Sequence, residues 1–176
     1  MKELILGGVR SGKSALAQRR AHESGLQLTY IATATAGDEA MAARIQRHRL
    51  ERGDEWALIE EPITLADALQ QSAAPDRCLL VDCLTLWLSN LLGGSGPTFE
   101  QRFHDQRQAL LTLLPQLPGH IILVSNEVNM GVVPLGALSR RFCDEAGWLH
   151  QALAQQCQRV TLTVAGLPLV LKGESV

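Results

Sequence analysis

A glycine-rich segment near the start of the chain constrains both the local fold and the class of ligand. Residues 7–14 read GGVRSGKS and fit the pattern G-x-x-x-x-G-K-[ST], in which backbone N–H groups converge on phosphate oxygens. The apolar run 4–6 precedes this segment and the helix-forming run 15–21 follows it, as such a loop requires. We therefore predict a strand, a phosphate-binding loop and a helix in succession. The alternative is a glycine turn followed by a chance lysine and serine.

Each residue type in this phosphate loop has a chemical reason. The glycines let successive N–H groups turn toward one anion, and the N-terminus of the helix adds partial positive charge. Lys13 is expected to reach the β- and γ-phosphates, and the Ser14 hydroxyl to hold Mg²⁺. The predicted nucleotide-binding residues of the loop are Gly7, Gly8, Val9, Arg10, Ser11, Gly12, Lys13 and Ser14.

Composition favours one domain that acts on small molecules. With 176 residues the chain can bury a core without disulfides or metals, so we predict a single domain over residues 1–176. A net charge of −2 does not favour a nucleic-acid or membrane partner. The four cysteines follow no metal or disulfide spacing and are expected to be buried free thiols. Without a signal-peptide pattern or a membrane-spanning apolar run, we expect a cytoplasmic protein.

Apolar runs rich in β-branched residues alternate with helical patterns along the chain. The predicted strands are 4–6, 28–32, 78–81, 120–125, 159–164 and 167–171, with Gly166 and Pro168 marking the last turn. Several of these runs are apolar throughout, which is typical of strands buried on both faces. We therefore predict an α/β fold of the P-loop NTPase type, a RecA-like, three-layer, doubly wound and mostly parallel sheet. The apolar helix over 84–92 suits either the core or a subunit interface.

Asp82 ends the apolar run 78–81, which places a carboxylate at the carboxyl end of a predicted strand. Beside a phosphate loop, such a carboxylate can bind Mg²⁺ directly or through water. The alternative is that Asp82 caps the following helix, because aspartate is a preferred N-cap residue. The upstream loop favours the metal role.

Residues 38–52 form a predicted helix that carries a basic cluster and a histidine. His48 shares a helical stripe with Ile45, and Arg44 and Arg52 lie four residues to either side of it. Cationic neighbours favour a neutral imidazole and can bind phosphate oxygens, which suits a histidine that attacks an α-phosphorus. On the residues alone, however, a solvated basic face with a bystander histidine is favoured.

The segment 125–134 follows a predicted buried strand and therefore lies at the same edge of the sheet as the phosphate loop. Glu127 could assist a metal or a substrate hydroxyl, or it could make a helix cap or a loop hydrogen bond. The two interpretations stay open. The histidines other than His48 follow no partner pattern and are assigned no chemistry.

Taken in order, these motifs resemble the bifunctional adenosylcobinamide kinase/adenosylcobinamide-phosphate guanylyltransferase family of cobalamin biosynthesis. The phosphate loop alone indicates only a superfamily, whereas the ordered set is specific and extends across nearly the whole chain. The resemblance rests on residues 7–14, 30–34, 38–45 with His48, Arg49 and Arg52, Trp56, 60–62, 80–85, 125–128, and Arg141, Phe142, Asp144 and Gly147.

The resemblance implies that His48 receives GMP from GTP and that Lys13 is catalytic. The further guanine-nucleotide residues that it implies are Thr33, Ala34, Thr35, Arg49, Leu50, Glu51, Arg52, Glu60 and Asp82. The implied reactions are phosphorylation of adenosylcobinamide by ATP or GTP and transfer of GMP to that phosphate with release of pyrophosphate. Both need Mg²⁺, for which Ser14 and Asp82 are the expected ligands, and we expect a homo-oligomer.

Three residues depart from the family pattern, and two other functions stay as alternatives. Gly53 stands where the family has proline, Asn129 where it has glycine, and His150 where it has asparagine. Because asparagine tolerates positive φ, a left-handed turn at Asn129 is expected to survive. The alternatives are a monofunctional small-molecule kinase and a GTP-dependent switch. The switch is disfavoured because the chain lacks an N/T-K-x-D sequence.

Overall fold

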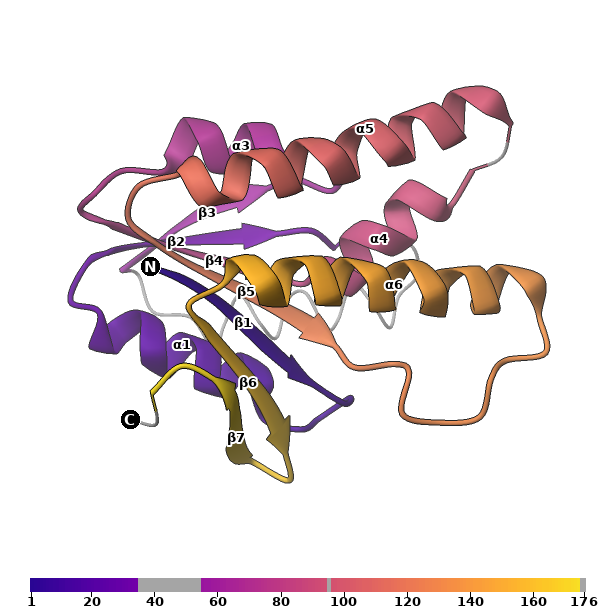
Figure 1. Ribbon diagram of the computed structural model, residues 1–176. Coiled ribbons are helices and arrows are strands. Elements are labelled where there is room, and N and C mark those ends of the chain that lie inside the picture. Colours follow the sequence, from indigo (N-terminus) through magenta and orange to yellow (C-terminus); the bar gives the residue numbers. More distant parts are fainter. Residues whose placement is uncertain (35–54, 95, 175–176) are drawn as a thin grey trace.

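The computed structural model describes residues 1–34, 55–94 and 96–174, which form a central sheet between two layers of helices (Figure 1). The strands are β1 Lys2–Gly7, β2 Gln27–Ala32, β3 Trp56–Glu60, β4 Arg77–Asp82, β5 His120–Asn126, β6 Arg159–Val164 and β7 Leu167–Lys172. The helices are α1 Lys13–Glu23, α3 Leu65–Ser72, α4 Leu84–Leu92, α5 Pro97–Leu113 and α6 Ala137–Gln156, with a 3₁₀ turn over Leu114–Gln116.

The seven strands follow the order β3-β2-β4-β5-β1-β6-β7. All pairs are parallel except β6 with β7, which is an antiparallel hairpin. This confirms the predicted doubly wound, mostly parallel sheet, and it places β5 between the phosphate-loop strand β1 and the Asp82 strand β4. Pro168 lies inside edge strand β7 and not in the turn before it. An edge strand tolerates proline because it can lack one N–H donor without breaking a hydrogen bond to a neighbouring strand.

Strand β3 was not among the predicted strands. Its five residues, WALIE, include only two large aliphatic side chains and end in a carboxylate, and all five are exposed or half-buried. It lies at the edge of the sheet, and among the described strands it pairs only with β2. An exposed edge strand does not need the continuous apolar run that marks the central strands.

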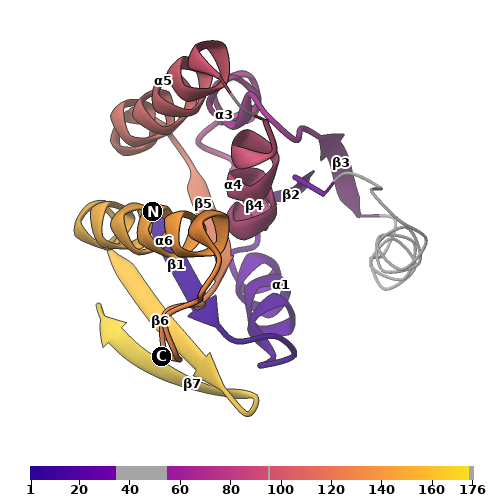
Figure 2. The same ribbon diagram turned by 90° about the vertical axis from the view of Figure 1, so that its right-hand side faces the viewer.

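Helices lie on both faces of the sheet (Figure 2), and a separate hydrophobic core lies on each face. On one face, Leu16 and Ala17 of α1 pack against residues such as Ile122 of β5. On the other face, the described helices α3, α4, α5 and α6 form a larger core around the fully buried Trp87. The apolar helix over 84–92 therefore belongs to the core, which settles the choice left open by its sequence.

The parallel register brings the carboxyl ends of the strands to one edge of the sheet. Gly7 of β1 pairs with Asn126 of β5, and Asp82 of β4 pairs with Val124 of the same strand. The phosphate loop and Asp82 thus flank the end of β5. This edge is where open α/β sheets bind their ligands.

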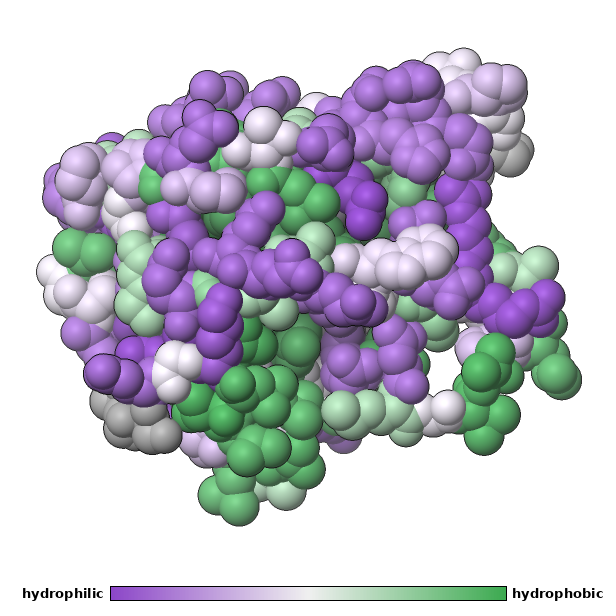
Figure 3. All heavy atoms as spheres, viewed as in Figure 1, coloured by the Kyte–Doolittle hydropathy of each residue, from purple (hydrophilic) through white to green (hydrophobic). Residues whose placement is uncertain are grey.

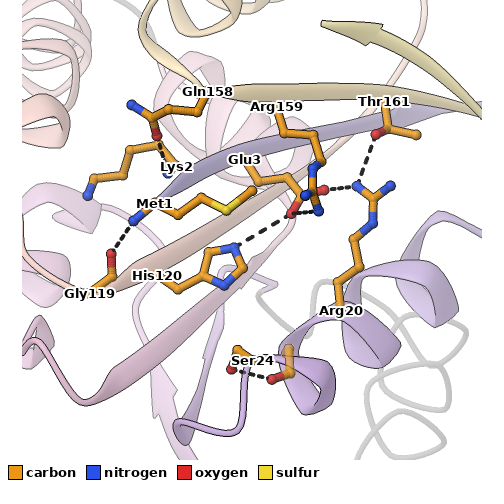
Figure 4. A network of polar contacts seen from close by, with 11 residues as sticks. Met1, Lys2, Glu3, Arg20, Ser24, Gly119, His120, Gln158, Arg159 and Thr161 are labelled. Carbon is orange, nitrogen blue, oxygen red and sulfur yellow. Dashed lines mark hydrogen bonds and ion pairs between the residues drawn. The ribbon is translucent and has the colours of Figure 1, made fainter. Parts of the chain in front are cut away.

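A buried ionic network around Glu3 lies at the amino ends of the strands, opposite the phosphate loop (Figure 4). Glu3 is fully buried and forms an ion pair with Arg20 of α1, while its Oε2 lies 3.9 Å from Arg159 Nη1 and 3.6 Å from His120 Nε2. Arg20 also donates a hydrogen bond of 3.0 Å to Thr161 Oγ1. Burial and the surrounding positive charges lower the pKa of His120 to about 4. The network joins β1 to α1, β5 and β6 at the end remote from the phosphate loop, and the two guanidinium groups compensate the buried carboxylate.

The prediction that the cysteines are buried free thiols is confirmed for three of the four. Cys78, Cys83 and Cys157 are buried free thiols, whereas Cys143 is only partly buried because it lines a cavity on α6. None of the helices in the described part of the chain has the length and apolar character that crossing a membrane requires.

Candidate phosphate-binding site

The phosphate loop between β1 and α1 has a backbone that requires its glycines. A Cβ on Gly7 would lie 2.7 Å from Thr163 O and 2.4 Å from Ser11 Oγ, so no larger residue fits there. Gly12 has φ 94°, in the left-handed region that favours glycine, and Arg10 also has positive φ, at 56°. Two residues with positive φ in one short loop help to turn neighbouring N–H groups into one concavity, as in an anion nest.

Neighbouring backbone groups hold the loop in this shape. Ser11 N donates a 3.2 Å hydrogen bond to Gly8 O, and Gly166 N of the β6–β7 turn donates a 2.9 Å hydrogen bond to Ser11 O. Among the described residues, no side chain caps the N-terminus of α1, and its first turn contains no acidic residue. The first N–H groups of α1 and their partial positive charge therefore favour an anion.

Lys13 and Ser14 begin α1, and their side chains lie on the site. Lys13 is buried, and its Nζ donates a 3.1 Å hydrogen bond to Gly8 O of its own loop. Ser14 Oγ donates a 2.9 Å hydrogen bond to Asp82 Oδ2 at the end of β4. The structure thus brings Ser14 and Asp82, which were predicted from two distant motifs, into direct contact.

Asp82 does not cap α4. The N-cap residue of α4 is Cys83, and no side-chain cap hydrogen bond is present. Asp82 Oδ2 instead accepts hydrogen bonds from Ser14 Oγ and, at 3.0 Å, from Tyr30 OH of β2. The second bond was not predicted, because Tyr30 reaches Asp82 only through the pairing of β2 with β4.

The Ser14 and Asp82 pair fits a Mg²⁺ ion. Both contribute hard oxygen donors, and their oxygens lie 2.9 Å apart at the mouth of the phosphate loop. Proteins usually bind Mg²⁺ through one or two carboxylates together with substrate phosphates and water. A hydroxyl and a carboxylate next to an anion nest form that donor set.

The predicted residues on β2 and β3 have different positions. Thr33 is fully buried, and its Oγ1 donates to Cys83 O at 2.7 Å and accepts from Cys83 N at 2.9 Å, so it joins the ends of β2 and β4. Ala34 follows it at the edge of the site. Glu60 is exposed at the end of β3 and pairs with Ala32, which in turn pairs with Asp82. Glu60 therefore lies two strands from Asp82, about 10 Å at the usual strand spacing.

The remaining predicted site residues lie outside the described part of the chain. They are Thr35, His48, Arg49, Leu50, Glu51 and Arg52, together with the predicted helix over 38–52 and the family departure at Gly53.

The segment after β5 lies at the carboxyl edge, as predicted. Glu127 Oε1 accepts a 2.6 Å hydrogen bond from Asn129 N, so the loop hydrogen bond, one of its two proposed roles, is present. Asn129 does not adopt positive φ; the only described non-glycine residues that do are Arg10 and Ala165. His150 is buried on α6, with Nε2 2.7 Å from Ser125 Oγ, and burial lowers its pKa although Glu127 opposes this shift.

Asn126 is a site residue that the sequence did not single out. It ends β5 between the phosphate loop and Asp82, and its backbone N donates a 3.2 Å hydrogen bond to Thr85 Oγ1. Its side-chain Oδ1 is buried and has no hydrogen-bond partner among the described residues. Because an unpaired buried acceptor costs roughly 1–3 kcal/mol, this oxygen is suited to a ligand donor.

Comparisons with known proteins identify the family of this chain. A protein family described as "Cobinamide kinase / cobinamide phosphate guanyltransferase" matches residues 3–171. The bifunctional adenosylcobalamin biosynthesis protein CobP of Pseudomonas aeruginosa is 62% identical over 174 residues, which cover 99% of both chains. The corresponding CobU protein of Escherichia coli is 36% identical over 182 residues, covering 98% of this chain and 100% of CobU.

Solved structures support the fold alone. A Pyrococcus horikoshii protein described as "Structural study of Project ID PH0250" superposes with a TM-score of 0.52 at 9% sequence identity. The alignment covers 99% of this chain and 87% of that one.

Proposed function

This chain belongs to the cobinamide kinase / cobinamide phosphate guanyltransferase family of cobalamin biosynthesis, and from that premise we propose that both of its reactions use the nucleotide held in the phosphate loop. The observation that carries the proposal is the set of hydrogen bonds that joins Ser14, Asp82 and Tyr30 beside the loop. The curated relatives are named bifunctional, which favours two reactions over a monofunctional kinase. A GTP-dependent switch has no support from this membership.

In the kinase reaction, the aminopropanol hydroxyl of adenosylcobinamide attacks the γ-phosphorus of ATP or GTP. The new P–O bond forms as the bond to the β–γ bridging oxygen breaks, and the hydroxyl proton passes to solvent. The loop N–H groups hold the phosphates, and Lys13 stabilises charge on the transferring group. Ser14 and Asp82 would hold Mg²⁺, which supplies electrostatic stabilisation of the β- and γ-oxygens when bound.

In the guanylyltransferase reaction, a ring nitrogen of His48 attacks the α-phosphorus of GTP and pyrophosphate leaves. A phosphate oxygen of adenosylcobinamide phosphate then attacks the same phosphorus, the P–N bond breaks, and adenosylcobinamide-GDP forms. The resemblance to the family and the flanking Arg44 and Arg52 support this role for His48. Thr33, Ala34, Thr35, Arg49, Leu50, Glu51, Arg52 and Glu60 remain proposed guanine-nucleotide residues.

Two labelled nucleotides test the proposed function directly. With γ-labelled GTP and adenosylcobinamide, the label is expected in adenosylcobinamide phosphate. With α-labelled GTP alone, it is expected on the protein, in the peptide that contains His48. A protein that transfers neither label would refute the proposal.

A Tyr30→Phe variant is expected to need more Mg²⁺. The change removes the hydroxyl that donates to Asp82 Oδ2 but retains the buried ring, so it loosens the orientation of the proposed metal ligand. Loss of a group that orients a metal ligand typically weakens metal binding by about tenfold or more. The Mg²⁺ concentration for half-maximal kinase rate should rise by about this factor, while kcat at saturating Mg²⁺ stays near that of the wild type.

Trp56→Phe is the matched control for Tyr30→Phe, because Trp56 packs edge-on against the Tyr30 ring but donates nothing to Asp82. An unchanged Mg²⁺ dependence in Tyr30→Phe, or an equal change in Trp56→Phe, would show that the hydroxyl does not orient the metal ligand.

We further propose a cytoplasmic homo-oligomer. Edge strand β7 exposes Leu167, Leu169 and Leu171 at 72%, 56% and 56% of their surface, and Figure 3 shows apolar atoms gathered over the β6–β7 hairpin. A long apolar edge strand on a monomer would promote aggregation, so a second copy is the occupant that suits it. Light scattering should give the mass of a dimer or a larger assembly of the 19.2 kDa chain. A monomeric mass would contradict this proposal.

A further inference from the structure

A cavity of about 400 Å³ lies between the loop that follows β5 and helix α6. Its volume is within the usual range of small-molecule sites, about 300–1,000 Å³. Apolar side chains of the loop and Trp148 of α6 line it together with the polar groups of Asn129, Asp144 and Gln151. The cavity is thus mixed in character, with hydrogen-bonding groups set in an apolar wall.

The loop that forms the cavity wall is fastened to α6 but leaves its apolar side chains in solvent. Arg140 Nη1 donates hydrogen bonds to Pro134 O, at 3.2 Å, and to Leu135 O. Val132, Val133 and Trp148 are nevertheless 96%, 71% and 55% exposed. Apolar atoms gather over this loop in Figure 3. Contiguous exposed apolar residues beside a polar pocket are typical of a binding surface.

The loop that lines the cavity starts beside the phosphate site. The loop begins directly after Asn126, whose strand pairs with Gly7, and Glu127 N donates a 3.0 Å hydrogen bond to Gly7 O. A substrate in the cavity can therefore extend a short arm past the buried, unpaired Oδ1 of Asn126 toward the phosphate loop. An acceptor oxygen there can accept a hydrogen bond from the hydroxyl of that arm.

The chemical groups of the corrinoid substrate are complementary to those of this surface. A corrin is a broad macrocycle with apolar faces and methyl groups, and primary carboxamides around its rim each donate and accept hydrogen bonds. Its reactive hydroxyl lies on a flexible arm. The cavity can hold one edge of the macrocycle, with its amides on Asn129, Asp144 and Gln151, while the exposed apolar side chains cover part of a face.

We propose that the cavity between the β5–α6 loop and α6 is the docking site of the corrinoid, with Asn126 accepting the hydrogen bond of its hydroxyl. The inference rests on the proposed function. The β6–β7 hairpin is also apolar, but its exposed leucines do not line this cavity, and a second copy suits them better.

Two pairs of variants test the site through direct binding. Val132→Asp places a charge on the cavity wall, and Leu171→Asp makes the same change at an exposed leucine of β7. Gln151→Ala removes a cavity amide, and Gln155→Ala removes an exposed amide one turn further along α6. All four residues are exposed on the single chain, so its fold should survive each change, and the mass shows whether Leu171→Asp alters assembly. For each variant, equilibrium dialysis gives the Kd for adenosylcobinamide without nucleotide. The Kd for GTP and the oligomeric mass of the protein are measured as well.

Val132→Asp should raise Kd for adenosylcobinamide at least about tenfold and Gln151→Ala about fivefold, with Kd for GTP unchanged and the two controls within twofold of the wild type. Unchanged adenosylcobinamide affinity in both cavity variants would overturn the inference. An equal loss in Leu171→Asp would also overturn it, because assembly and not the cavity would then hold the substrate. If the wild type neither binds nor phosphorylates adenosylcobinamide, the proposed function fails as well; a wild type that does both isolates the failure to this site.

Discussion

Replacement of Lys13 by alanine is expected to reduce the rates of both phosphoryl and guanylyl transfer by about a thousandfold. Removing one preorganised donor from developing transition-state charge typically costs 10²–10³ in kcat. Lys13 is buried at the mouth of the phosphate loop, where its ammonium already contacts Gly8 O. Initial rates with γ- and α-labelled GTP, measured on the same preparation, would give both effects.

Lys172→Ala is a suitable control for Lys13→Ala. Lys172 is exposed and, among the described residues, donates only to backbone carbonyls at the end of α6, so both rates should stay near those of the wild type. A normal kinase rate in Lys13→Ala would indicate a second phosphate site. A loss confined to the kinase reaction would mean that guanylyl transfer uses different phosphate contacts from those of the loop.

The parts of the fold that were predicted correctly are those specified by local physical requirements. In the phosphate loop, Gly7 is required because a Cβ there would meet Thr163 O, and Gly12 is favoured because its φ is positive. Both requirements appear in the sequence directly as glycines. The central strands are buried on both faces, so each is a continuous apolar run. Their order in the sheet is not local information, but alternation of strand and helix restricts it to a few parallel arrangements.

The parts that were missed depend on contacts between distant residues. Tyr30 and Asp82 are far apart in sequence and meet only because β2 pairs with β4 in the observed register. Asn126 is one residue of a polar segment. That its side-chain oxygen is buried and unpaired is apparent only in the folded structure, where the surrounding groups can be seen. Edge strand β3 lacks an apolar pattern because it is half-solvated. Each of these depends on tertiary packing, whereas a single sequence shows mainly local preference.

His48→Ala is expected to abolish the covalent GMP adduct and guanylyl transfer while leaving substantial kinase activity. The covalent step needs a nucleophilic ring nitrogen at residue 48, and alanine offers none. The kinase step needs only the acceptor hydroxyl and the groups that hold the γ-phosphate, which the change does not alter. The adduct, a phosphoramidate, should be labile to acid and stable to base, and labelled protein from α-labelled GTP would be counted before and after acid treatment.

His104→Ala is the control for His48→Ala, because His104 is exposed on α5 and has no proposed role. It should retain the adduct and both rates. An acid-labile GMP adduct on His48→Ala would show that another residue is the nucleophile. Loss of the kinase reaction together with guanylyl transfer would mean that the segment around His48 also positions the γ-phosphate. Because Lys13→Ala should impair both reactions and His48→Ala only one, the two variants together distinguish a shared nucleotide site from two independent ones.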